Sequence, residues 1–221
     1  MSISNNLNSI LNQIPSHVML VAVSKTHPVS AIQEAYKFGQ KHFGENKVQE
    51  LIEKQTALSK DIYWHLIGHL QSNKVKYIAP FVFLIHSVDS LKLLQEINKE
   101  GLKNKRVINC LLQVYIAKEE TKYGLDSHEL DAIINELDNL PFVKIYGLMG
   151  MASNTENAEQ VRMEFRGLKV LFDKLKLIKK ENFQLEILSM GMSSDYLLAI
   201  EEGSNLIRVG SSIFGSRDYS N

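Results

Sequence analysis

Short runs of apolar residues alternate along the chain with longer stretches in which apolar positions recur at helical spacing. Each apolar run has the length of a strand and ends in polar or glycine-containing residues. This pattern predicts buried strands that are each followed by a helix. The eight predicted strands lie at residues 17–25, 42–46, 62–68, 82–89, 107–116, 143–151, 186–192 and 206–214.

The stretches between these runs predict helices, and residues 157–180 are the clearest example. Their apolar residues follow one another at spacings of three and four, which places them on one face of a helix. Asn154 or Thr155 is a candidate cap for the start of this helix. Ser90 and Ser127 are candidate caps for two further helices that begin just after them.

Apolar strands that alternate with helices are typical of parallel pairing with both faces of the sheet covered. Eight such units in 221 residues favour an α/β protein with a (β/α)₈ barrel of the TIM type, and residues 3–13 predict an extra N-terminal helix. The alternative is an open, doubly wound sheet. Because no linker, repeat or low-complexity tract divides the chain, we expect residues 1–221 to form a single domain.

Composition narrows the class of function. Lysine plus arginine and aspartate plus glutamate both number 25, so no basic excess indicates a nucleic-acid partner. The sequence shows no signal peptide and no apolar run that is long enough to span a bilayer. The single cysteine, Cys110, lies in an apolar run and predicts a small buried side chain. We therefore expect a cytoplasmic protein without membrane contact. Because the sequence shows no exposed heptad pattern or obvious patch that demands a dimer, we also expect a monomer.

A lysine stands at the end of the first predicted strand, in the sequence LVAVSKTHP. Lys25 has the parity of Val21 and Val23 and so shares their face of the strand. Active sites of such barrels lie at the C-terminal ends of the strands. If that face points inward, burial lowers the pKa of the Lys25 amine, and a neutral amine forms a Schiff base with a carbonyl. The alternative is a lysine that reaches to the rim or pairs with Glu45.

Two glycine-serine segments near the C-terminus have the composition of phosphate-binding loops. MGMSSD, residues 190–195, runs from a predicted strand into a helical stretch, and IRVGSSIFG, residues 207–215, ends the last predicted strand. Glycine lets the backbone approach a ligand closely, and serine hydroxyls and amides at a helix start suit an anion. In this fold a phosphate site is common at the loops after strands 7 and 8. Ordinary turn and capping chemistry is the alternative for any one of these serines.

Other kinds of site have less support in the sequence. His65 and His69 are four residues apart, but a glycine separates them at a strand end, no HExxH occurs and Cys110 is alone. We therefore expect no metal site. The chain also contains no GxSxG, GxxxxGK[ST] or GxGxxG sequence, which disfavours a nucleophile elbow, a nucleoside triphosphate and a dinucleotide.

Several motifs in one order resemble those of a known family. The motifs are AVSKTHP, HFGENKVQEL, WHLIGHLQSNKVKYI, HSVDS, KYGL, YGLMGMAS, LSMGMSSD and IRVGSSIFG. Together they are similar to the YggS/PROSC family, the pyridoxal phosphate homeostasis proteins, from about Val18 to Gly215. The resemblance implies a (β/α)₈ barrel like the N-terminal domain of alanine racemase, with bound pyridoxal 5′-phosphate (PLP).

The resemblance also implies roles for individual residues. It implies that Lys25 of the SK motif carries PLP as an imine and that Asn46 of the GEN motif lies beside the cofactor. The residues implied to bind the phosphate are Ser193, Gly210 and Ser211. Arg208 is implied to face the pyridine nitrogen. Relatives often have an asparagine where this chain has Tyr115, so the resemblance implies no contact from that position.

Three functions follow as hypotheses. The first is a carrier that takes part in intracellular PLP homeostasis and passes the cofactor to apo-enzymes by transient contact, with no robust catalytic activity and no catalytic residues. The second is a PLP-dependent amino-acid racemase, and the third is a Schiff-base aldolase acting on a sugar phosphate. The resemblance implies that racemases take a tyrosine base from a second, β-rich domain. The chain ends six residues after Gly215, which favours the carrier.

Overall fold

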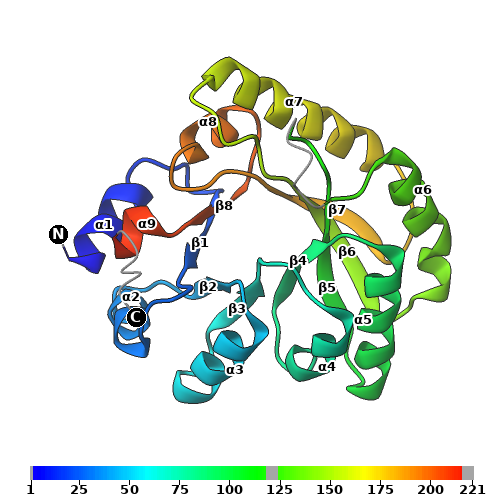
Figure 1. Cartoon of the computed structure of the whole chain (residues 1–221), viewed down its shortest axis with the longest axis horizontal. Coiled ribbons are helices and arrows are strands. Elements are labelled where there is room, and N and C mark those ends of the chain that lie inside the picture. The colour runs from blue at the N-terminus through cyan, green and yellow to red at the C-terminus, as the bar shows by residue number, and fades with distance from the viewer. Residues whose placement is uncertain (1, 118–123, 216–221) are drawn as a thin grey trace.

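A ring of parallel strands forms the centre of the computed structural model, which describes residues 2–117 and 124–215 (Figure 1). Within these residues the strands follow one another in sequence order around the ring, and the last pairs with the first to close the barrel. The strands are β1 (Met19–Val23), β2 (His42–Glu45), β3 (Tyr63–Leu66), β4 (Leu84–Val88), β5 (Ile108–Gln113), β6 (Val143–Met149), β7 (Phe183–Ser189) and β8 (Leu206–Val209). The predicted (β/α)₈ barrel is confirmed, and the open-sheet alternative is wrong.

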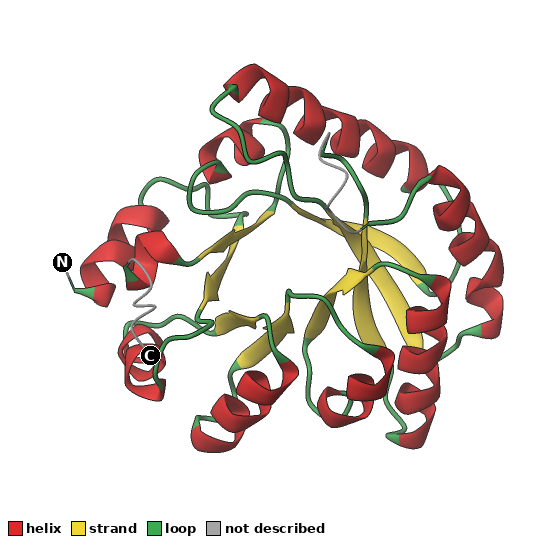
Figure 2. Cartoon of the chain, in the orientation of Figure 1, coloured by secondary structure: helices red, strands yellow, loops and turns green. Residues whose placement is uncertain are grey.

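Helices surround the strands on the outside of the barrel (Figure 2). They are α1 (Ile3–Leu11), α2 (Val29–Lys37), α3 (Val48–Ala57), α4 (Val75–Ile78), α5 (Leu91–Lys103), α6 (Ser127–Glu136), α7 (Ala158–Leu175), α8 (Tyr196–Glu201) and α9 (Ser211–Phe214), with short 3₁₀ turns at Ser72–Lys74 and Leu137–Asn139. The extra N-terminal helix is α1, as predicted. It lies beside α9, where the Asn6 side chain donates a hydrogen bond of 2.9 Å to the Ile213 carbonyl.

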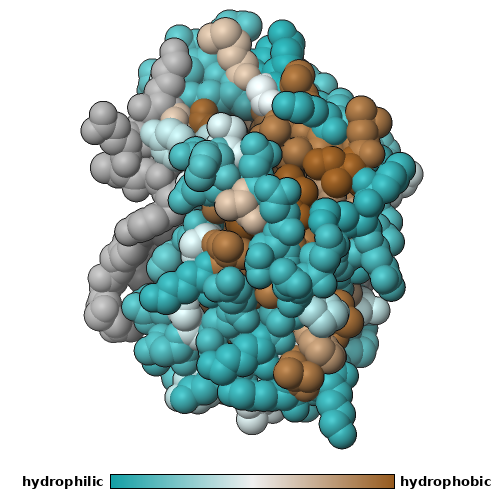
Figure 3. Space-filling model, turned by 90° about the vertical axis from the view of Figure 1, so that its right-hand side faces the viewer, coloured by the Kyte–Doolittle hydropathy of each residue, from teal (hydrophilic) through white to brown (hydrophobic). Residues whose placement is uncertain are grey.

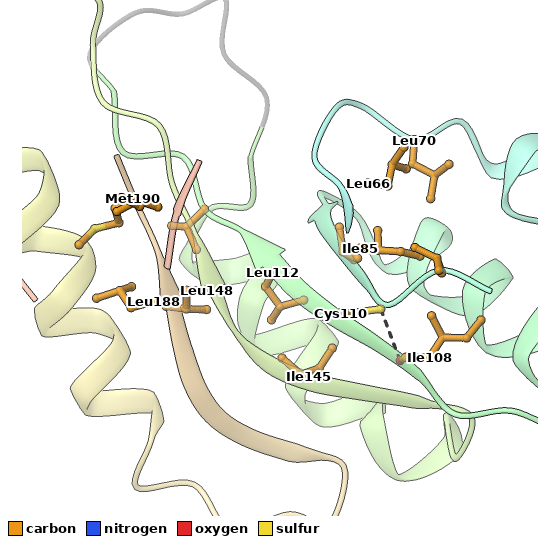
Figure 4. Packing of buried hydrophobic residues seen from close by; sticks show 14 of the residues in the cluster. Leu66, Leu70, Ile85, Ile108, Cys110, Leu112, Ile145, Leu148, Leu188 and Met190 are labelled. Carbon is orange, nitrogen blue, oxygen red and sulfur yellow. Dashed lines mark hydrogen bonds between the residues drawn. The ribbon is translucent and has the colours of Figure 1, made fainter. Parts of the chain in front are cut away.

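The outer face of the barrel packs against the helices. Ile108, Cys110 and Leu112 of β5 belong to this outer layer. Ile145 and Leu148 of β6 lie next to them (Figure 4). Cys110 is fully buried, as predicted, and burial raises the pKa of its thiol. The thiol is therefore a small apolar part of the core.

The inner face of the barrel carries a second, smaller apolar layer. Its fully buried members are Val21, Leu84, Leu111, Met149 and Leu206. Because the helices cover one face and the lumen the other, these strands are apolar at consecutive positions. Burial of each such apolar side chain stabilises the folded state by roughly 1.5–3 kcal/mol relative to leaving the side chain exposed.

Several boundaries differ from their predicted positions. β8 ends at Val209 and not at residue 214, because the backbone leaves the extended conformation at Gly210 and Ser211 begins α9. The cap of α7 is Asn157, whose side chain accepts from the Gln160 N–H, so the prediction of Asn154 or Thr155 is wrong.

Two further predicted caps have different outcomes. Ser90 caps α5 as predicted, accepting from the Leu93 N–H. Ser127 is the first residue of α6 and not its cap. Asp126 is the cap, because it and Glu129 accept from each other's backbone N–H in a capping box.

The surface on the side of α5 and α6 is mostly hydrophilic, and a group of hydrophobic side chains lies at the upper right of the view in Figure 3. Among the described residues, no helix combines the length and the apolar character needed to cross a membrane.

Candidate functional site

A cavity of about 460 Å³ lies at the C-terminal ends of the strands. This volume falls within the range of roughly 300–1,000 Å³ that is common for small-molecule sites. All six residues named as site residues from the sequence line it: Lys25, Asn46, Ser193, Arg208, Gly210 and Ser211. A larger cleft of about 1040 Å³ adjoins the cavity and shares Met151, Met192, Ser193 and Ser194 with it.

Lys25 reaches the cavity from the end of β1. Val21 lies in the inner layer of the barrel, and Val23 lines the cavity with Lys25, so the three residues share a face as their parity predicts. The residue that follows, Thr26, has a φ of 67°, a left-handed conformation that is uncommon for a residue other than glycine. Its N–H donates to the Glu50 carboxylate, which holds the chain in this turn.

A buried ionic cluster supports the backbone on which Lys25 stands. The Lys54 ammonium lies 2.7 Å from the Ser24 carbonyl, 2.8 Å from Glu45 Oε1 and 2.6 Å from Glu50 Oε1. The Ser24 hydroxyl donates to the same Glu45 oxygen at 2.6 Å. The Glu45 carboxylate is therefore bound by Lys54 and Ser24, and the cluster joins the ends of β1 and β2 to α3.

Burial raises the pKa of the Glu45 carboxyl above its usual range, while Lys54 and Ser24 oppose the rise. The other carboxyl oxygen, Oε2, is buried without a hydrogen-bond partner, which adds to the cost of the charged form. Glu45 immediately precedes Asn46, so this cluster fixes the second strand end as well as the first.

The end of β3 passes very close to Asn46. A Cβ atom on Gly68 would lie 2.5 Å from the Asn46 carbonyl oxygen, so a side chain at this position would push the two loops apart. The Ser87 hydroxyl donates to the Gly68 carbonyl, and His69 Nδ1 lies 3.1 Å from Asp89. The residues after β4 thus hold the β3 loop against the cavity.

Ser193 connects the two glycine-serine segments. Its Oγ accepts from the Gly210 N–H at 3.2 Å and from the Ser212 N–H at 3.4 Å. The loop after β7 can turn back toward β8 because Gly191 has a φ of 92°, and a Cβ there would lie 2.7 Å from the Ala199 Cβ. Both hydrogen bonds use Ser193 as an acceptor, so its hydroxyl hydrogen can still donate into the cavity.

Arg208 is the charged side chain of β8 at the floor of the cavity, and it is 4% exposed. Its Nη1 donates to the carbonyl and the hydroxyl of Ser189, and its Nη2 donates to the Gly150 carbonyl at 3.1 Å. The remaining Nη2 and Nε hydrogens can serve a ligand. Burial lowers the pKa of Arg208 to about 10, so the guanidinium keeps its charge near neutral pH.

Sequence reasoning did not find every residue around the cavity. Gln113, at the end of β5, lines it and is 5% exposed, whereas Tyr115, close to the end of the predicted strand at residues 107–116, is not among the lining residues. Met151 and Met192 supply apolar walls. The first two residues of the KYGL motif lie outside the described residues. Within the described part of the chain, no group of three or more His, Cys, Asp or Glu residues is arranged to hold a metal ion.

Comparisons with known proteins agree with this architecture. Residues 1–218 match the family described as alanine racemase, N-terminal domain. A pyridoxal phosphate homeostasis protein of Aquifex aeolicus is 45% identical over 201 residues, which cover 90% of this chain and 87% of the relative. The protein of the same name from Escherichia coli K12 is 36% identical over 217 residues, covering 93% of this chain and 88% of the relative.

Solved structures give the same fold. The structure of PipY from Synechococcus elongatus with PLP bound has a TM-score of 0.88 and 41% identity, and the match covers 97% of this chain and 100% of PipY. Alanine racemase of Clostridium difficile has a TM-score of 0.79 at 15% identity, with 99% of this chain matched to 58% of that chain. At such low identity, the likeness to the racemase concerns the fold alone.

Proposed function

Because the chain belongs to the family of pyridoxal phosphate homeostasis proteins, we propose that it binds PLP in the cavity at the strand ends and holds it for delivery to other proteins. One observation carries this proposal: an amine, a guanidinium and serine donors line one cavity of about 460 Å³. These groups suit the aldehyde, the pyridine nitrogen and the phosphate of PLP, respectively.

Lys25 is the proposed covalent anchor. PLP supplies, when bound, an aldehyde that an amine takes up covalently with loss of one water molecule, and a ring that can draw electrons from an attached amino acid. The cluster of Lys54, Glu45 and Glu50 fixes the backbone on both sides of Lys25, so the amine enters the cavity from a rigid support. Asn46 stands at the next strand end and lines the same space.

Ser193 and the start of α9 are the proposed phosphate anchor. Ser193 can donate its hydroxyl hydrogen, and Ser211 adds a hydroxyl and a backbone N–H at the same edge of the cavity. Hydrogen bonds to an oxyanion are about twice as strong as those between neutral groups. The phosphate therefore supplies a large share of the affinity.

Arg208 supports a carrier over an amino-acid racemase. The guanidinium remains protonated and has donors but no acceptor, so it can donate to the ring nitrogen but cannot accept a proton from it. Its charge also disfavours a second positive charge on the ring. A ring that stays unprotonated draws electrons poorly, and enzymes that depend on this ring usually place an acidic group there. We therefore propose that the protein binds PLP reversibly without rapid turnover of amino acids, as a soluble monomer that contacts apo-enzymes transiently.

Borohydride reduction of the PLP-loaded protein tests the anchor. Mass spectrometry should find the cofactor on a peptide that contains Lys25, and Lys25→Ala should lose the visible absorption band. Lys92→Ala is the matched control, because Lys92 is an exposed lysine on α5, and it should keep both the band and the label. Label on another lysine, with Lys25 unmodified, would contradict the assignment.

Two assays run side by side separate the carrier from the racemase. Incubation with a PLP-dependent apo-enzyme should restore that enzyme's activity, while α-deuterium exchange on a panel of amino acids should be negligible. Exchange at ordinary enzymatic rates, about 1–10³ per second, that is abolished by Lys25→Ala would identify an enzyme. An aldolase would show no visible band in the purified protein.

A further inference from the structure

Three histidines form a continuous hydrogen-bonded chain inside the barrel, and the chain ends on Arg208. His42 Nδ1 lies 3.0 Å from His65 Nε2, and His65 Nδ1 lies 2.9 Å from His86 Nε2. His86 Nδ1 then lies 3.3 Å from Ser189 Oγ, which accepts from Arg208 Nη1. These five side chains come from β2, β3, β4, β7 and β8. We refer to His42, His65, His86 and Ser189 as the histidine chain.

The histidine chain connects the cavity to the opposite end of the barrel. His65, His86 and Ser189 are fully buried, whereas His42, the first residue of β2, is partly exposed. Around the open end, the ring of His42 stacks on Tyr63 and meets the edge of Phe83. Among the described residues, the charged and titratable groups that act on His86 are His65 and Arg208, and Arg208 is in turn influenced by Asp195. The proposed PLP contacts use none of these histidines.

The donor and acceptor properties of Arg208 and Ser189 determine in which direction the hydrogen bonds of the histidine chain are donated. Arg208 can only donate, so Ser189 Oγ is an acceptor for it. Among the described contacts, His86 Nδ1 is the one acceptor that can take the Ser189 hydroxyl hydrogen. His86 then carries its hydrogen on Nε2 and donates to His65 Nδ1, and the same relation repeats from His65 to His42. In this arrangement the side-chain N–H and O–H hydrogens of His65, His86 and Ser189 all have acceptors, whereas the reverse direction leaves the Ser189 hydroxyl without one among the described contacts.

We infer that His86 is a positioning residue for the cofactor, acting through Ser189 to hold the Arg208 guanidinium toward the ring. This inference rests on the proposed function. His86 fixes the Ser189 hydroxyl, and the fixed oxygen orients Nη1, so the donors left on Arg208 point in one direction. The lowered pKa values of His65 and His86 agree with two neutral rings beside a guanidinium.

The first arm of the test needs no ligand. NMR of isotope-labelled histidine in the protein without added PLP should place the hydrogen of His86 and of His65 on Nε2. A hydrogen on Nδ1 of His86 would overturn the inference, because His86 would then donate to Ser189 and no longer fix its hydroxyl.

The second arm measures PLP binding and the pH at which the visible band changes. Ser189→Ala and His86→Leu should each weaken binding about tenfold or more, as expected for a lost hydrogen bond that supports a charged group, and should shift the midpoint of the spectral pH titration. His86→Asn should restore the midpoint toward wild type, because its amide oxygen can accept near the position of Nδ1.

Leu84→Ala is the control, because Leu84 lies on the same strand and in the inner layer two residues before His86. It should lower stability and leave the midpoint unchanged. If His86→Leu and Ser189→Ala lower stability but leave the midpoint unchanged, as expected for Leu84→Ala, the histidine chain only fills the lumen of the barrel and the inference is wrong. Failure of the wild-type protein to take up PLP would overturn both the proposed function and the role of His86 toward the cofactor. The NMR arm is independent of PLP and decides on which nitrogens the hydrogens of the histidine chain lie.

Discussion

Ser193 shows how much of the site depends on single atoms. One oxygen accepts from the backbone of both Gly210 and Ser212 and so ties the loop after β7 to the start of α9. The same hydroxyl can donate to a phosphate oxygen. Removing it changes the shape of the anchor and the number of donors together.

Ser193→Ala should weaken PLP binding by about 1.5–3 kcal/mol, the scale of a hydrogen bond to a charged group. The affinity for pyridoxal, which has no phosphate, should change much less. Fluorescence titration with both ligands measures the two effects. Ser212→Ala is the control, because the contact of Ser212 uses its backbone N–H, which alanine retains. Equal losses for PLP and pyridoxal would place the phosphate elsewhere.

Sequence parity and motif position were enough to bring Lys25, Arg208 and the glycine-serine segments to one cavity, because all parallel strands of a barrel end at the same face. Their roles toward PLP stay predictions. The link from Arg208 through Ser189 to His86 could not be predicted, since it joins residues that are far apart in sequence across the barrel lumen. Gln113 was missed because the strand was expected to continue to residue 116, beyond Tyr115.

At the scale of elements, the type and order of helices and strands follow from periodicity, whereas their ends depend on local hydrogen bonds. Asn157 caps α7 in place of Asn154 or Thr155 because its side chain reaches the Gln160 N–H. Likewise, a run of strand-like residues after Val209 becomes α9, because the backbone turns at Gly210. Apolar patterns do not contain this information.

The Lys54 cluster links three elements, and its loss should be costly. Lys54→Met would leave the Glu45 carboxylate buried without its cation, for which a loss of about 3–5 kcal/mol is expected. Urea denaturation at pH 8 measures the change. The loss should be smaller at pH 5, because Glu45 can then take up a proton.

Lys99→Met is the matched control for this prediction. Lys99 forms an exposed pair with Glu96 on α5, and such a pair contributes about 0–1 kcal/mol. Lys54→Met with no greater cost than Lys99→Met would show that the buried cluster does not support the strand ends.

The lumen of the barrel contains buried titratable side chains, and these make the stability of the whole molecule depend on pH. Burial lowers the pKa of His65 and His86 well below the usual value, and the charges of His42 and Arg208 act in the same direction. In the unfolded chain a histidine titrates near pH 6.5. Below that pH the unfolded state therefore binds protons that the folded state does not, and stability falls as the pH falls.

Glu45 has the opposite effect to the buried histidines on the way stability changes with pH. Because its pKa is raised, the folded state takes up this proton at a higher pH than the unfolded state does. Its contribution therefore favours the folded state more as the pH falls, and becomes smaller as the pH rises through the raised pKa. Since Glu45 is unchanged in histidine variants, comparison of their pH dependence isolates the histidines.

Replacing one of the buried histidines should make the protein less sensitive to acid. Each histidine that is kept neutral in the folded state makes the free energy of unfolding fall by about 1.4 kcal/mol per pH unit below pH 6.5. His86→Asn should remove one such contribution, so its curve of stability against pH should be less steep than that of wild type, although the variant is less stable near pH 7. Exposed His128→Asn on α6 is the control and should leave the slope unchanged. Urea denaturation at pH 5, 6, 7 and 8 gives the three slopes. If His86→Asn has the wild-type slope, His86 takes up a proton within the folded barrel, which would also contradict the neutral ring beside Arg208.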